Sequence, residues 1–249
     1  GILFFAFKNE SECDKKIVYN KYNISKIWRN YIMGENSECK KVLHSCVDCG
    51  VTNCNKMDKY YPDFCLTTAM DETLLGEVIR LYDDEENKKV TLAAAGVESD
   101  YYCQMCRVEE TIEFAKRIGA KKIGIATCVG LIRETRTLTK ILRSHGFEVY
   151  GVACKAGTVR KTEVGIPKTC ENTGVNMCNP ILQAKMLNAE HTDLNIVMGL
   201  CVGHDSMFYK YAEGLTTTLV VKDRVLGHNP VAALYAADGY YHNKLCPQD

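Results

Sequence analysis

Two groups of cysteines in this chain have the spacing and surroundings of metal ligands. The first group, the N-terminal set, follows the pattern C-x2-C-x4-C-x10-C. Its members are Cys46, Cys49, Cys54 and Cys65. The C-x2-C turn lets two thiolates bind one ion or neighbouring irons of one cluster, and Gly50 permits a tight backbone turn beside it. Residues 41–69 show little hydrophobic periodicity, so we expect bound metal to supply their folding free energy.

The identity of that metal is indicated only by the spacing. Structural zinc sites usually combine two close cysteine pairs, whereas this segment has one pair and two single cysteines. The asymmetry favours a [4Fe–4S] cluster, with zinc as the alternative. Free thiols or disulfides are the remaining alternative, and disulfide scaffolds are typical of short secreted chains rather than of long ones.

The second group, the strand-end set, is spread along the rest of the chain. Its members are Cys128, Cys154, Cys178 and Cys201. Three of them follow apolar runs with the length of buried strands, at residues 123–127, 147–153 and 194–200. Ligands of open parallel sheets bind at the carboxyl ends of the strands, so we expect three thiols in one crevice. Cys178 precedes a predicted helix start at Pro180, where free N–H groups suit an anionic cluster.

Each cysteine of the strand-end set, taken alone, also fits an ordinary buried thiol, because free cysteine is among the most buried residue types. The recurrence at three strand ends favours a second [4Fe–4S] cluster instead. Polar residues follow the third and fourth strands and are expected at the same edge, where they are candidates for proton transfer or substrate binding. They are His204, Asp205, Lys222 and Asp223. Helix capping and strand-end ion pairs are the alternatives for them.

The elements that must position these residues are predicted from hydrophobic periodicity. Residues 121–155 alternate strand, helix and strand, which is the βαβ unit of a parallel sheet. The run 194–200 and the β-branched segment 216–223 add two more strands, while residues 70–118 are predicted to be helical. Residues 156–179 are predicted to form a long loop, and loops of that length are usually functional.

The sequence therefore predicts an α/β protein with a Rossmann-like parallel sheet of about four strands, together with a cysteine-rich metal-binding module. We predict an N-terminal extension at residues 1–40, the module at 41–69, and a helical lead-in with the α/β domain at 70–249. The 249-residue chain carries no net charge, which argues against nucleic acid as a partner. No apolar run reaches the length of a membrane span. Fourteen cysteines without a secretion signal favour a reducing cytoplasm, as in an anaerobe.

Several segments carry a resemblance to a known family. They are SCVDCG, RVEETIEFAKRIGAKKIGIATCVGL, GFEVYGVACKAG, CNPILQAKMLN, TDLNIVMGLCVGHDSMFYKY and TLVVKDRVLGHNP. Over about residues 44–240 the chain resembles the cysteine-rich, metal-binding family called domain of unknown function 1847. The resemblance implies that both cysteine sets and the four polar candidates belong to the family pattern, whereas Cys103, Cys106 and Cys170 do not obviously belong to it. It implies metal binding and names no reaction.

Three functions are compatible with these observations. The first is an iron–sulfur protein with two clusters that acts in electron transfer or as a redox enzyme, with an electron-transfer protein or a small molecule as partner. The second is a zinc-stabilised binding or regulatory module. The third is a zinc-dependent hydrolase in which His204 or Asp205 is the base beside an open coordination position.

Overall fold

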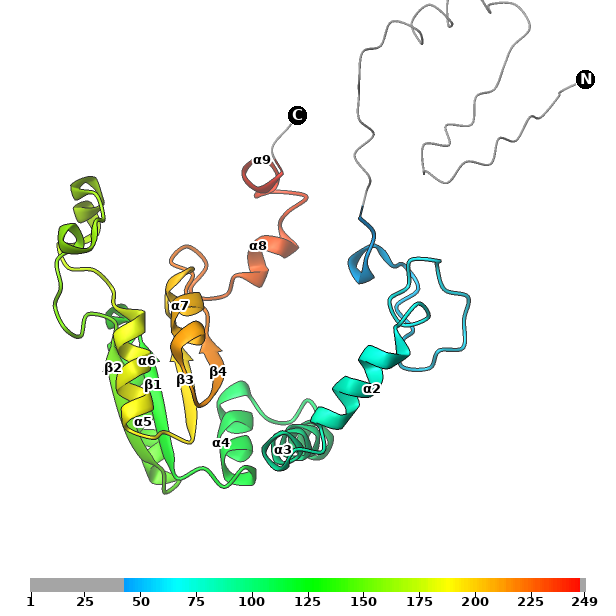
Figure 1. The fold of residues 1–249 in the computed structure, drawn as a ribbon. Coiled ribbons are helices and arrows are strands. Elements are labelled where there is room, and N and C mark those ends of the chain that lie inside the picture. Colours follow the sequence, from blue (N-terminus) through cyan, green and yellow to red (C-terminus); the bar gives the residue numbers. More distant parts are fainter. Residues whose placement is uncertain (1–42, 247–249) are drawn as a thin grey trace, which may run out of the picture. The chain divides into compact units, whose positions relative to one another are not determined.

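The structure is a computed structural model that describes residues 43–246 (Figure 1). The chain divides into two compact units, Gly1–Arg80 and Leu81–Asp249. The predicted N-terminal extension, residues 1–40, lies outside the described residues. The predicted cysteine-rich module lies in the first unit from residue 43 onward. No helix in the described part of the chain has the length and apolar character needed to cross a membrane.

The first unit is built mostly of turns. It contains the short 3₁₀ helix η1 (Cys46–Asp48) and the helix α2 (Glu72–Leu81), which has no buried residue. Between them, the Tyr61 hydroxyl donates a hydrogen bond to the carbonyl of Asn53 at 3.1 Å. Cys65 is the one residue of the range 43–80 that is buried. Local hydrogen bonds rather than an apolar core therefore hold this unit in the structure.

The second unit contains a four-stranded, all-parallel sheet with the strand order β2-β1-β3-β4. The strands are β1 (Lys122–Thr127), β2 (Glu148–Ala153), β3 (Leu194–Met198) and β4 (Leu215–Val220). The central strand β3 is buried along its whole length, as expected for a strand covered on both faces. The predicted α/β fold with a parallel sheet of about four strands is confirmed.

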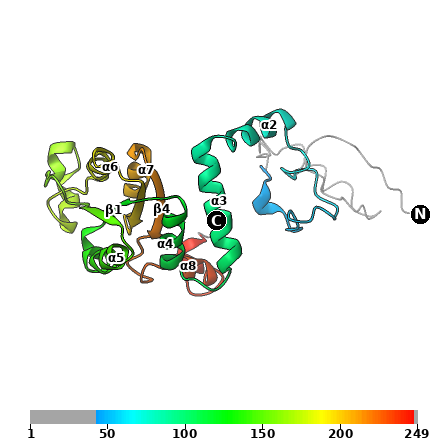
Figure 2. The same ribbon diagram turned by 90° about the horizontal axis from the view of Figure 1, so that it is seen from below.

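Helices cover both faces of the sheet. The helices of the second unit are α3 (Glu85–Tyr101), α4 (Arg107–Arg117), α5 (Ile132–Ser144), α6 (Pro180–Ala189), α7 (His204–Tyr211), α8 (Val231–Tyr235) and α9 (His242–Leu245), of which α8 and α9 have no buried residue. On one face, Leu138 and Leu142 of α5 pack in a core with Ile123 of β1. On the other face, Leu187 of α6 and Phe208 of α7 pack in a second core. Figure 2 shows α5 and α6 on opposite sides of β1.

The order of the strands reverses direction at β1, which indicates where such a sheet would bind a ligand. The chain leaves β1 through α5 to reach β2 on one side, then returns through α6 to β3 on the other side of β1. Ligands of open α/β sheets bind at this kind of switch point, outside the carboxyl ends of the strands. The switch point of this sheet is at the carboxyl ends of β1 and β3, which is where the sequence predicts a crevice.

The segment between β2 and α6 is more ordered than the predicted loop. It contains two short 3₁₀ helices, η3 (Lys161–Val164) and η4 (Lys168–Thr173), which form a small lobe. The buried ammonium of Lys161 donates to the carbonyl of Cys170 and, at 2.9 Å, to the hydroxyl of Thr173. Hydrophobic periodicity could not predict this order, because the lobe is held by polar contacts rather than by an apolar face.

Candidate thiol site at the carboxyl edge of the sheet

The pairing of β1 with β2 places Cys128 beside Cys154. Thr127 and Ala153 are register partners, and each cysteine directly follows one of them. The backbone N–H of Cys154 donates to the carbonyl of Thr127 at 2.8 Å. The backbone N–H of Val129 donates to the sulfur of Cys154 at 3.3 Å. Both cysteines are buried, so the sheet itself fixes this pair of thiols.

Cys178 reaches the same place from the far side of the lobe. The next residue, Asn179, donates its backbone N–H to the carbonyl of Cys154 at 2.7 Å. The side chain of Asn179 also caps α6 by accepting a hydrogen bond from Leu182 N at 3.1 Å. These contacts hold the half-buried Cys178 against the core that contains Cys128 and Cys154. We call Cys128, Cys154 and Cys178 the thiol row.

A buried glutamine, which the sequence analysis did not select, ties the ends of two strands together below the row. Gln183 of α6 is fully buried, and its side-chain NH₂ donates to the carbonyls of Thr127 at 3.1 Å and Val152 at 2.7 Å. Its side-chain oxygen has no hydrogen-bond partner among the described residues. The one signal in the sequence is a polar residue at the start of an apolar helix, and this pattern is too common to be specific.

The charge distribution along the row is set by the middle thiol. Hydrogen bonding with Cys128 and then with Cys178, together with burial, raises the pKa of Cys154. The same hydrogen bond from Cys154 is the largest cause that lowers the pKa of Cys128. It is also the largest cause that lowers the pKa of Cys178. The thiolate form is thus favoured at both ends of the row and the thiol form in its middle.

Cations lie at both ends of the row. Near Cys128, the ammonium of Lys222 and the Cys128 sulfur both border Gly130, where an added Cβ would be 3.9 Å and 3.7 Å from them. Lys222 also lowers the pKa of Cys128. Near Cys178, hydrogen bonding between His204 and this thiolate is the main cause that raises the pKa of the imidazole.

A second cation acts on the Cys178 end of the row. Lys155 lowers the pKa of Cys178 through its charge, and its ammonium is held by the carbonyl of Asn176 at 2.5 Å. His204 and Lys155 thus flank one thiolate while Lys222 flanks the other. Positive charge is therefore placed where the row carries its negative charge.

The structure places the remaining candidates of this edge outside the row. Because β3 ends at Met198, Cys201 lies three residues beyond the strand, and its sulfur accepts a hydrogen bond from Arg224 at 2.9 Å. Asp205 accepts a hydrogen bond from the backbone of the neighbouring Ser206. Of the polar candidates, His204 and Lys222 therefore contact the thiol row.

The carboxylate of Asp223 is used by its own loop. One of its oxygens accepts the backbone N–H groups of Val225 at 2.9 Å and Leu226 at 2.7 Å. The backbone N–H of Asp223 donates to the ring of His228 at 3.1 Å. These contacts close the turn after β4, which is the capping role that polar residues often take after a strand.

The N-terminal set is more open than the thiol row. Cys46 and Cys54 are exposed, Cys49 is half-buried and Cys65 is buried.

Within residues 43–246, no three His, Cys, Asp or Glu side chains are grouped closely enough to hold a metal ion. The chemistry of the donors nevertheless fits a soft metal in the thiol row, since thiolates are the form of cysteine that binds metal and the row provides two of them.

Fold and site together define an α/β protein with a Rossmann-like parallel sheet and a thiol site at the carboxyl edge of its strands. Residues 65–219 match the family described as "Protein of unknown function (DUF1847)", and the chain belongs to this family. It is 44% identical over 194 residues to the uncharacterized protein MJ0455 of Methanocaldococcus jannaschii, an alignment that covers 78% of this chain and 96% of that protein. The predicted family is confirmed.

The range that matches the family contains some of the candidate residues but not all of them. It contains the whole strand-end set, together with Cys65, His204 and Asp205. Cys46, Cys49, Cys54, Lys222 and Asp223 lie outside it. The thiol row and its histidine thus belong to the matched part of the chain.

Proposed function

We propose that the protein is an iron–sulfur protein in which the strand-end set holds a [4Fe–4S] cluster above the sheet. The observation that carries the proposal is the thiol row, in which cysteines from three distant segments meet with a cation at each end. Cys201, on the loop after β3, completes the set of four thiols. Fe–S clusters are held by cysteine thiolates, and four cysteines are the usual complement.

The surroundings of the row suit an anionic, thiolate-ligated group. Lys222 and Lys155 supply positive charge on its two sides, and the backbone N–H of Val129 points at the sulfur of Cys154. Net charge and hydrogen bonds to sulfur are the features by which proteins set the potential of a cluster. Gly130 leaves room for close approach of the backbone between Cys128 and Lys222.

When bound, such a cluster supplies one-electron transfer. The protein residues bind and orient it, and His204 is positioned to hold or release a proton beside Cys178. We propose an electron-transfer protein or a small-molecule substrate as the partner, and electron transfer or redox catalysis as the activity. The described cysteines are free thiols, which supports a reducing cytoplasm as the compartment.

We also propose that the N-terminal set holds a second cluster, which passes electrons. The segment from residue 43 to 71 has one buried residue, Cys65, and its order comes from turns. Small metal-binding segments take their folding free energy from the metal, because the ligands order the chain around it. Four cysteines in a segment without an apolar core are what such a role requires.

Zinc is the second candidate, and one contact favours it. His204 beside Cys178 extends the thiol row to three sulfurs and one imidazole, which is a known donor set of structural zinc. In a binding or regulatory module, protein ligands would fill all coordination positions of this zinc. A hydrolase requires an open position and a base, for which His204 and Asp205 are the candidates.

Purification without oxygen followed by elemental analysis and electron paramagnetic resonance tests these proposals directly. We expect a brown protein with two clusters per chain and a signal on reduction. Colourless protein with stoichiometric zinc would replace the iron–sulfur proposal by the zinc one. Protein purified without oxygen that holds no transition metal would contradict both.

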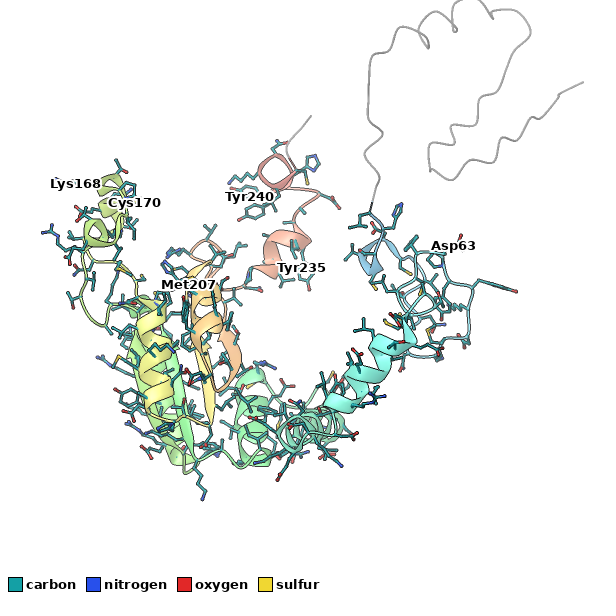
Figure 3. The ribbon with its side chains drawn as sticks, viewed as in Figure 1. Asp63, Lys168, Cys170, Met207, Tyr235 and Tyr240 are labelled. Carbon is teal, nitrogen blue, oxygen red and sulfur yellow. The ribbon has the colours of Figure 1, made fainter. Side chains whose placement is uncertain are left out.

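Two variants assign the metal to the sites. Cys154→Ser should remove about half of the bound iron, because the middle sulfur of the thiol row is lost while the N-terminal set is intact. Cys170→Ser is the matched control, since Cys170 is an exposed cysteine on the lobe formed by η3 and η4 (Figure 3). Unchanged iron in Cys154→Ser would remove the thiol row from the proposal.

A further inference from the structure

We propose that Cys178 and Cys154 form a thiol–disulfide couple that works without metal, in which Cys178 attacks a low-molecular-weight disulfide and Cys154 resolves the product. This activity is separate from the proposed cluster and does not rest on it. The observations that carry it are the accessibility of the three sulfurs, their contacts with each other, and the groups that surround Cys178.

The three thiols of the row differ in accessibility. Cys154 is 3% exposed and Cys128 is 8% exposed, whereas Cys178 is half-buried. Of the three, Cys178 is therefore the residue most open to a dissolved disulfide. Reactive redox cysteines are accessible and stand next to a second, resolving cysteine.

The position of Cys154 makes it the resolving residue. Its side chain contacts Cys178 on one side and Cys128 on the other. The bond from Asn179 N to the carbonyl of Cys154, at 2.7 Å, holds the backbone of the two segments together directly beside the thiols. A mixed disulfide on Cys178 would thus form next to a second cysteine that is already in place.

Cationic groups select Cys178 as the attacking sulfur. His204 hydrogen-bonds to it, and the ammonium of Lys155 lies near both. Other described cysteines are more exposed, among them Cys103, Cys106 and Cys170. Accessibility alone would therefore favour those cysteines, and a preference for Cys178 would have to come from its neighbours.

The reaction balances with the disulfide as oxidant. The Cys178 sulfur attacks one sulfur of the reagent, its S–S bond breaks, and one half leaves as a thiolate. Cys154 gives its proton to this leaving thiolate and attacks the Cys178 sulfur, which releases the second half as a thiolate. Two protein thiols become one disulfide, and one reagent disulfide becomes two thiols.

The test uses oxidised glutathione and the full chain, both as purified without oxygen and after treatment with a chelator, with peptide mapping by mass spectrometry. In the chelated protein we expect a disulfide between Cys154 and Cys178. In Cys154→Ser and Cys154→Ala, a mixed disulfide should accumulate on Cys178 about tenfold faster than on Cys170, the exposed control. Circular dichroism checks that each variant is folded. Two different replacements of Cys154 are used, so that a local distortion caused by one of them does not decide the result.

Three results would overturn the proposal. One is modification of Cys170, Cys103 or Cys106 as fast as that of Cys178. Another is a wild-type disulfide that joins Cys128 to Cys154. The third is that no more mixed disulfide accumulates in the Cys154 variants than in the wild type.

This experiment distinguishes a failure of the metal proposal from a failure of the thiol–disulfide proposal. If the protein as purified is protected and chelation removes the protection, a metal at the thiol row is supported whatever chemistry the free thiols then show. If protection is absent but Cys178 reacts as expected, the thiol–disulfide couple stands and the metal proposal for the row is contradicted.

Discussion

The two cysteine sets of this protein are positioned by different means. In the strand-end set, the pairing of β1 with β2 brings Cys128 and Cys154 together, and the cap of α6 adds Cys178. In the N-terminal set, turns carry the cysteines, and Cys46 and Cys54 are exposed. Strand pairing and a helix cap thus position the strand-end set, whereas the N-terminal set has little besides its own cysteines to order it.

This difference suggests distinct roles for the metal at the two sites. A preformed thiol site loses little conformational entropy when it binds its ligand, because its side chains are already in place. A site without a core must be ordered by binding, and the metal then contributes directly to folding. Four experiments test whether the two regions differ in this way.

Metal removal should separate the two regions most clearly. After chelation we expect hydrogen-exchange protection in residues 43–71 to fall at least about 100-fold, because metal binding supplies the stability of such segments. The amides of β1 to β4 should keep their protection. Equal loss in both regions, or persistent protection of residues 43–71, would contradict the proposed division.

Replacing Gln183 tests whether the protein fold itself holds the thiol row. Gln183→Leu removes two buried hydrogen bonds, while the carbonyl of Thr127 keeps the backbone N–H of Cys154 as a donor, so the free energy of unfolding should fall by about 2 kcal/mol. Urea unfolding followed by circular dichroism measures the change. Gln104→Leu is the matched control, because Gln104 is exposed and should change stability by less than about 0.5 kcal/mol. Similar effects of the two variants would show that Gln183 does not support the strand ends.

A pair of glycine replacements compares the two regions directly. In β1, an added Cβ at Gly124 would lie 3.1 Å from Leu187 and Thr192 and even closer to the Asn195 side chain. Gly124→Ala should therefore cost about 1–3 kcal/mol through overpacking. Gly50, beside the C-x2-C pair, has no atom within 4 Å of that position, so Gly50→Ala should be nearly neutral in the chelated protein. A large cost at Gly50 would reveal packing around the N-terminal set.

The smallest effect is expected at the amino ends of the strands, far along β1 from the thiols. Burial opposes ionisation of Asp193, but the backbone N–H groups of Lys122 and Lys121, at 2.8 Å and 2.7 Å, outweigh it and lower the pKa of the carboxyl. The carboxylate thus stabilises the fold above its unfolded pKa of about 3.9. Asp193→Asn should cost about 1 kcal/mol at pH 7.

The stabilisation by Asp193 should depend on pH, because the pKa of its carboxyl is lowered in the folded protein. As the pH falls below about 4, the wild type should lose the advantage over Asp193→Asn, because the folded carboxyl becomes protonated. Urea midpoints measured at several pH values would show the convergence. A difference that stays constant down to pH 2 would mean that the charge of Asp193 does not contribute.

The parallel sheet could be predicted from the sequence because three of its strands are apolar runs separated by segments of helix length and the fourth is rich in β-branched residues. The expectation that strand-end cysteines converge follows from the parallel sheet alone, and the structure brings Cys128 and Cys154 together in this way. The contact of Cys178 with the row depends on how a lobe folds back, which no periodicity encodes. Gln183 was missed because its role rests on two carbonyls from different strands. Asp223 was selected as a candidate for the site, whereas in the structure a turn uses its carboxylate.

The small lobe between β2 and α6 has a consequence for how this protein can vary. Its two ends are joined by an antiparallel bridge between Arg160 and Asn176, and the ammonium of Lys161 links its interior. Insertions or deletions beyond the bridge need not displace the residues at its base, where Lys155 and Cys178 lie. Relatives should therefore differ in length at this lobe more readily than at the turns after β1 or β3, and a foreign peptide grafted there should leave the sheet intact.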